Sequence, residues 1–132
     1  MKKIFLSICL LLPFYVFAGS YALYDFDSHH FLIRSNETEV RPIASITKII
    51  TAATVINSGV DLNETIRVNG KSKGHVPVGA VMTRMDLLRA MLISSDNRAA
   101  DLLCQNYVGG YKRCIEDMNT NARIWGLTNT TL

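Results

Sequence analysis

Residues 41–50 read Arg-Pro-Ile-Ala-Ser-Ile-Thr-Lys-Ile-Ile, and this stretch decides the fold. Pro42 disfavours helical geometry in the residue before it, so an extended segment ends here. Apolar residues then follow on almost every side as far as Asn57-Ser58-Gly59, where a glycine favours a helix C-terminus. We therefore expect a core helix over this stretch rather than an amphipathic helix at the surface.

Within this helix, Ser45 and Lys48 are three residues apart, so their side chains lie on one face within reach of each other. A cation in the first turn faces the positive end of the helix dipole, and burial also disfavours its charged form. Both effects favour a neutral amine, which can take the proton of a serine hydroxyl and activate it as a nucleophile. For an isolated Ser-x-x-Lys, however, a serine N-cap followed by a solvated lysine is the commoner explanation.

The N-terminus has the organisation of a secretory signal peptide. Lys2 and Lys3 precede an apolar run that ends at Val16-Phe17-Ala18, with small residues at the cut. The run is shorter than the ~20 residues that a membrane-spanning helix needs. We predict a signal peptide over residues 1–18 and one domain over residues 19–132, exported to the periplasm or secreted.

The charge of the chain gives little indication of a charged partner. There are 14 basic and 11 acidic residues, and without Lys2 and Lys3 the formal net charge falls from +3 to about +1. No basic stripe suggests a nucleic-acid partner, and a membrane surface would be met only peripherally. His29 and His30 have no third ligand at a suitable spacing, so we read them as turn residues and expect no metal or other cofactor.

The rest of the chain alternates short strands and helices. Two β-rich runs at 21–26 and 31–34 predict a hairpin. Thr83 and Asp86 form a capping-box-like start to a helix. The apolar residues that we expect this helix and the next two to bury are Leu87, Leu88, Met91 and Leu92, then Ala99, Leu102 and Leu103 in a helix over 98–107, and Met118 and Ile124 in one over 111–125.

Two cysteines follow the leader, Cys104 and Cys114. In an oxidising compartment such a pair can form a disulfide. The alternative is two small buried apolar side chains on neighbouring helices. The sequence leaves both open because it does not supply the distance between them.

A second motif, Ser95-Asp96-Asn97, stands between two helices about fifty residues after Ser45. Ser-x-x-Lys followed by Ser-x-Asn is the signature of active-site-serine penicillin-recognising enzymes. The chain resembles the low-molecular-mass penicillin-binding proteins, and within them the D-alanyl-D-alanine endopeptidase branch. The segments that carry this resemblance are residues 22–25, 41–48, 91–100, 109–112 and 126–130.

The resemblance implies roles for five residues. Ser45 would be the acylated nucleophile and Lys48 its proton acceptor, while Ser95 would pass a proton to the leaving amine. Asn97 would bind the substrate backbone and orient Lys48, and Asp96 would cap the next helix. The implied substrate is a peptidoglycan stem peptide, β-lactams would acylate the same serine, and no cofactor or metal is implied.

The resemblance also implies an α+β fold of the serine β-lactamase and penicillin-binding-protein transpeptidase type. This chain lacks the third motif of that family, Lys-Thr-Gly or Lys-Ser-Gly on a later strand, because Lys71-Ser72-Lys73-Gly74 has an extra lysine and precedes Ser95. We therefore expect an incomplete fold whose sheet is reduced to one hairpin. The chain is then a D-Ala-D-Ala peptidase or its N-terminal portion, an inactive peptidoglycan- or penicillin-binding fragment, or, third, a serine β-lactamase.

Overall fold

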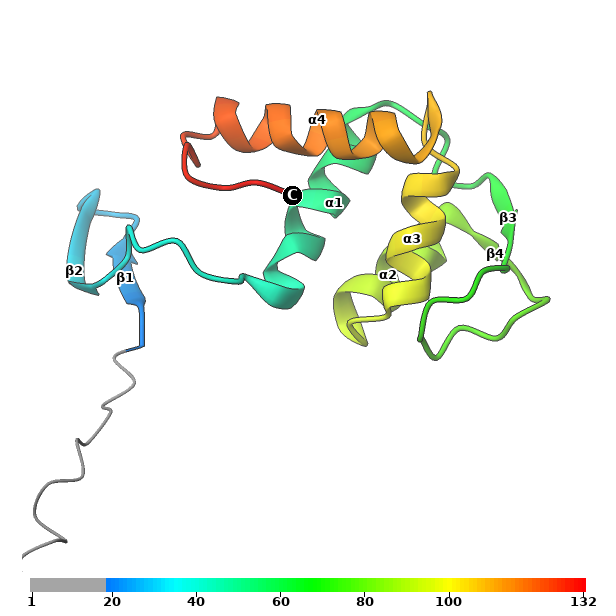
Figure 1. Cartoon of the computed structure of the whole chain (residues 1–132), viewed down its shortest axis with the longest axis horizontal. Helices are drawn as coiled ribbons and strands as arrows, with labels where there is room; N and C mark the ends of the chain where they lie inside the picture. Colours follow the sequence, from blue (N-terminus) through cyan, green and yellow to red (C-terminus); the bar gives the residue numbers. More distant parts are fainter. Residues whose placement is uncertain (1–18) are drawn as a thin grey trace, which may run out of the picture. The chain divides into compact units, whose positions relative to one another are not determined.

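The computed structural model describes residues 19–132, and the predicted signal peptide lies outside this range. The chain divides into two units, one ending at Glu39 and one spanning Val40–Leu132 (Figure 1). We describe each unit by itself. Among residues 19–132, no helix has both the length and the apolar character needed to span a bilayer.

The first unit is a β-hairpin, as the sequence predicted. Strand β1 (Tyr21–Asp25) pairs antiparallel with β2 (His30–Ser35), and the register shifts between Leu23 and Tyr24. The Asp25 carboxylate organises the turn by accepting hydrogen bonds from the Asp27 backbone N–H and the Ser28 hydroxyl. The predicted turn therefore has a local polar cause, but it holds only His29, because His30 is the first residue of β2 and pairs with Asp25.

The second unit combines four helices with a small two-stranded ladder (Figure 1). In chain order its elements are the 3-10 helix η2 (Ala44–Ile46), α1 (Thr47–Asn57), β3 (Thr65–Arg67), β4 (Val81–Thr83), α2 (Arg84–Ile93), α3 (Asn97–Gln105) and α4 (Gly110–Ile124). Strands β3 and β4 are antiparallel. We expected a sheet reduced to one hairpin, and this expectation was wrong. The second unit has a ladder of its own, because Val81–Thr83 returns to pair with Thr65–Arg67.

The helix ends follow the predicted capping residues. Thr83 caps α2, its hydroxyl accepting from the Asp86 N–H and donating to the Asp86 carboxylate. After the C-terminal end of α1, Gly59 adopts a positive φ of +74°, which is costly for a residue with a side chain. These local signals fixed where α1 ends and α2 begins.

The core lies where α1, α2, α3 and α4 meet. It contains most of the apolar residues that the sequence assigned to it, among them Val55, Leu87, Met91, Leu102, Leu103 and Met118. Two of the expected core residues, Leu92 and Ile124, are exposed instead. Both stand in the last turn of their helix, beyond the packed part of the bundle.

Helix α1 is not enclosed on all sides, contrary to expectation. One face, with Ile50, Thr54 and Val55, packs into the bundle. The opposite face carries Ile49 and Ile56, and Ile49 is 62% exposed. Apolar composition all round the helix predicted complete burial, but the second unit supplies neighbours to only one of its faces.

Among residues 19–132, Arg84 is the largest buried side chain, with 2% of its surface exposed. Its guanidinium donates to the carbonyls of Asp61 and Asn106 and forms an ion pair with Glu64. The Arg84 side chain thereby ties the 61–64 segment to the end of α3. Its burial is explained by this complete set of acceptors.

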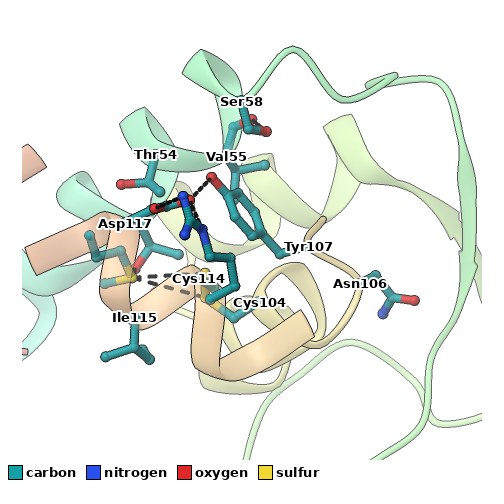
Figure 2. Close-up of a disulfide and its surroundings, with 12 residues drawn as sticks. Thr54, Val55, Ser58, Cys104, Asn106, Tyr107, Cys114, Ile115 and Asp117 are labelled. Atoms are coloured by element: carbon teal, nitrogen blue, oxygen red, sulfur yellow. Dashed lines mark hydrogen bonds and ion pairs between the residues drawn. A yellow bond between two sulfur atoms is a disulfide. The ribbon is translucent and has the colours of Figure 1, made fainter. Parts of the chain in front are cut away.

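Cys104 and Cys114 form a disulfide that joins α3 to the first turns of α4, with 5.3 Å between their Cα atoms (Figure 2). Both sulfur atoms contact the Met118 sulfur at 3.9–4.0 Å. Beside the bridge, the Tyr107 hydroxyl donates to the Asp117 carboxylate at 3.0 Å. Burial raises the pKa of Tyr107, and the Asp117 carboxylate raises it further. The structure thus decides between the two alternatives that the sequence left open.

Candidate active site

Ser45 lies in η2, two residues before α1 begins, rather than inside the α-helix itself. Lys48 is the second residue of α1. A 3-10 turn has about three residues, so residues i and i+3 lie directly above each other. The two side chains meet as predicted, with 3.1 Å between Lys48 Nζ and Ser45 Oγ.

The second motif forms the connection between α2 and α3. Ser95 Oγ donates a hydrogen bond to Ser45 Oγ at 2.7 Å, and Lys48 Nζ donates to Asn97 Oδ1 at 2.7 Å. The structure therefore brings all four predicted site residues together in one continuous chain of hydrogen bonds. Lys48 is 9% exposed, whereas the contact between the two serine hydroxyls is open to solvent.

Two non-glycine residues at this site adopt left-handed backbone geometry. Ala44, directly before Ser45, has φ +46°, and Ser95 has φ +53°. Each such residue costs about 1–3 kcal/mol and persists only where the surrounding structure imposes it. Their location at both sides of the Ser45–Ser95 contact is typical of a functional site.

Asp96, the middle residue of the second motif, accepts hydrogen bonds from the start of α3 and from an earlier loop. It is the N-cap of α3, accepting from the Ala99 N–H at 2.8 Å, which confirms the capping role expected for it. It also accepts from the backbone N–H groups of His75 and Val76. Burial by itself raises the pKa of Asp96, but these three hydrogen bonds and the nearby Arg98 charge lower it overall. Sequence reasoning missed the contact with residues 75–76, because nothing in the motif indicates a partner twenty residues earlier.

Two cavities, each of about 330 Å³, border the hydrogen-bonded chain. The first lies among α1, α3 and α4, and Lys48, Asn97, Cys104 and Met118 are among its lining residues. The second lies between Ser95–Asn97 and the loop at residues 73–75. Within residues 19–132, no group of three His, Cys, Asp or Glu side chains is placed to hold a metal ion.

An α+β fold with a serine and a lysine at the start of one helix and Ser-Asp-Asn before another defines a class, the active-site-serine penicillin-binding proteins. Residues 13–132 match the D-alanyl-D-alanine carboxypeptidase family. The chain therefore belongs to the D-alanyl-D-alanine carboxypeptidase family.

Curated relatives are similar over most of this chain. It is 36% identical over 120 residues to a D-alanyl-D-alanine endopeptidase of Escherichia coli and 38% identical over 120 residues to that of Pseudomonas aeruginosa. Each alignment covers 86% of this chain and 39% of the relative. The chain thus spans about two-fifths of the length of these proteins.

Solved structures show the same fold. Penicillin-binding protein D2 of Listeria monocytogenes, in its ampicillin-bound form, superposes with a TM-score of 0.74 at 26% identity. The superposition covers 92% of this chain and 52% of that protein. This confirms the fold class expected from the resemblance, again over part of the longer protein.

Proposed function

We propose that the hydrogen-bonded chain of Ser95, Ser45, Lys48 and Asn97 is the acyl-transfer site of a serine-type D-Ala-D-Ala peptidase acting on peptidoglycan stem peptides. One observation carries this proposal. Ser45 Oγ lies 3.1 Å from Lys48 Nζ and 2.7 Å from Ser95 Oγ, so one hydroxyl has a proton acceptor and a hydrogen-bond donor on separate elements. This is the geometry required of an activated nucleophile.

The surroundings of Lys48 support its role as the general base. Among residues 19–132, no carboxylate forms a salt bridge with its ammonium group, although the side chain is almost fully buried. Lys48 Nζ donates to Asn97 Oδ1, which holds the amine 3.1 Å from Ser45 Oγ, within reach of the hydroxyl proton.

The proposed reaction has two stages. Ser45 Oγ bonds to the carbonyl carbon of the scissile amide while its proton passes to Lys48 Nζ. The carbon–nitrogen bond then breaks, and the leaving amine takes, through Ser95 Oγ, the proton that Lys48 Nζ had accepted. Water next attacks the ester, so the peptide leaves as a carboxylic acid and the Ser45 hydroxyl is restored. A β-lactam would open its ring amide at the same serine.

Export and processing belong to the same proposal. The basic head, apolar run and small residues around Ala18 support cleavage before Gly19 and a periplasmic location of the mature chain. In a Gram-negative host, the mass of the chain recovered from the periplasm tests this. A mass beginning at Gly19 is expected, and an uncleaved chain found only in the membrane fraction contradicts it.

Covalent labelling tests the site itself. The whole chain is incubated with a fluorescent penicillin, and intact mass and peptide mapping locate the adduct. We expect one adduct on Ser45, none in Ser45→Ala, and labelling about 10²–10⁴-fold slower in Lys48→Gln. Ser94→Ala removes an exposed hydroxyl from the same turn as Ser95 and serves as the matched control, which should label like wild type.

Turnover assays with muropeptides and with a β-lactam, combined with the labelling, separate the three candidate functions. Release of D-alanine or cleaved cross-links from muropeptides identifies a peptidase. A stable adduct with no turnover of either substrate identifies a penicillin-binding fragment, and rapid hydrolysis of the β-lactam identifies a β-lactamase. A folded chain without any adduct at Ser45 contradicts the proposal.

A further inference from the structure

The second cavity joins the proposed catalytic residues to a loop that the reaction does not use. Its lining consists of Lys73, Gly74 and His75 on one side and Ser95, Asp96 and Asn97 on the other. Its volume of about 330 Å³ is sufficient for a substrate side chain. A group bound in this cavity lies next to the Ser95 hydroxyl and the Asn97 amide, which are proposed to act on the substrate.

The backbone of this loop is held in place from α3. Asp96 accepts from the N–H groups of His75 and Val76. The Arg98 guanidinium donates to the carbonyls of Ser72, Gly74 and Val76. These bonds fix the main chain beside the second motif, so the loop is an ordered wall of the cavity.

Gly74 shows how closely this wall is packed. A Cβ atom at this position would lie 2.3 Å from Asp96 Oδ1 and 2.8 Å from Arg98 Cβ. Only a residue without a side chain lets the loop approach the second motif so closely. Lys73 and His75, on either side of Gly74, line the cavity with it.

Some of the ionisable side chains around the cavity have hydrogen-bond or ion-pair partners, and others do not. The Asp96 carboxylate is buried and saturated by three backbone N–H groups, with Arg98 close by. Lys73 and His75 are exposed, and in the described part of the chain neither side chain forms an ion pair, while Lys73 also forms no hydrogen bond. Residues 70–79 include two lysines and no carboxylate. The cavity therefore offers an available ammonium group and an imidazole.

We infer that Lys73 and His75 form a carboxylate-binding subsite that selects stem peptides by a carboxylate other than the C-terminal one. This inference rests on the proposed function, since it assigns part of the same substrate. Stem peptides carry such groups on the α-carbon of isoglutamate and, where present, on the side chain of diaminopimelate. The Lys73 ammonium pairs with the carboxylate, and the imidazole N–H of His75 donates to it.

Equilibrium binding of synthetic stem peptides tests the subsite without requiring turnover. Fluorescence anisotropy compares the fully free peptide with one amidated at isoglutamate and one amidated at diaminopimelate. The readout is the ratio of Kd for the amidated and free peptides, which does not depend on the fraction of folded chain. We expect about fivefold weaker binding for one amidated peptide, the upper range for a solvent-accessible ion pair, and a smaller ratio at high salt.

Variants assign the effect to Lys73. In Lys73→Gln the ratio should fall to about one. Lys71→Gln removes an equal charge from the same loop but from outside the cavity lining, so the ratio should persist. His75→Gln keeps an N–H donor at a similar position and should keep most of the ratio, whereas His75→Ala should lower it.

Several outcomes overturn the subsite. They are a ratio of one for both amidated peptides, an equal loss in the Lys71 and Lys73 variants, or no peptide binding at millimolar concentration. Failure of the proposed function is distinguishable. A penicillin adduct on Ser45 with a ratio of one removes only the subsite, and a fivefold ratio without an adduct leaves a binding cleft that lacks the chemistry.

Discussion

Reduction of the Cys104–Cys114 disulfide should destabilise the folded chain by an amount that its loop length sets. The two cysteines are 10 residues apart in sequence. Releasing a closed loop of this size restores chain entropy to the unfolded state worth about 2.7 kcal/mol at 25 °C. Both side chains are buried, so reduction leaves two thiols in place and opens no cavity. The loss should therefore come from the loop alone.

The assay is urea unfolding followed by circular dichroism, with and without a reducing agent. With a slope of ~1–3 kcal/mol per molar urea, the midpoint should fall by roughly 1–3 M on reduction. Peptide mapping of the unreduced chain should show Cys104 linked to Cys114. The double variant Cys104→Ala/Cys114→Ala is the matched control, whose midpoint should not respond to the reducing agent.

Two results would refute this reasoning. If the midpoint is the same in both conditions while mapping shows the bridge, the loop constrains an unfolded state that is already compact. If mapping shows two free thiols in protein recovered from an oxidising compartment, the bridge does not form. The double variant should be less stable than the reduced chain, because removing two sulfur atoms beside Met118 also costs packing.

Two further predictions concern buried polar residues. Asp96→Asn should lose about 1–3 kcal/mol of unfolding free energy at neutral pH, because the amide NH₂ of the variant meets backbone N–H groups. Because the pKa of Asp96 is lowered in the folded state, the stability that its carboxylate contributes is present above the ordinary carboxylate range and is lost as pH falls through the folded pKa. Measured against pH, the stabilities of wild type and Asp96→Asn should therefore converge in acid. If their unfolding curves stay parallel down to strong acid, the carboxylate charge is not the cause. Arg84→Met should cost about 2 kcal/mol or more in urea unfolding by leaving the carbonyls of Asp61 and Asn106 without a donor, whereas Glu64→Gln, at the exposed end of the ion pair, should change stability by less than ~1 kcal/mol; equal losses in both variants would contradict this account.

Local chemistry in the sequence determined much of the fold. Thr83 and Asp96 marked helix starts because short polar side chains bond to the N–H groups that follow them. The hairpin was evident from two β-rich runs around a polar turn. Ser45 and Lys48 were recognisable as a pair because three residues of helix bring them together. All of these depend on neighbours within about one turn of chain.

The remainder depended on distances between segments far apart in the chain. Only the packing of α1 against α3 brings Ser95 to Ser45 and Asn97 to Lys48, across about fifty residues. The exposed face of α1 and the pairing of β3 with β4 depend on which elements are available as neighbours, and composition does not report this. The disulfide and the loop held by Asp96 likewise depend on how α3 and α4 pack. The sequence determines which side chains are able to bond, and the tertiary fold determines which of them come into contact.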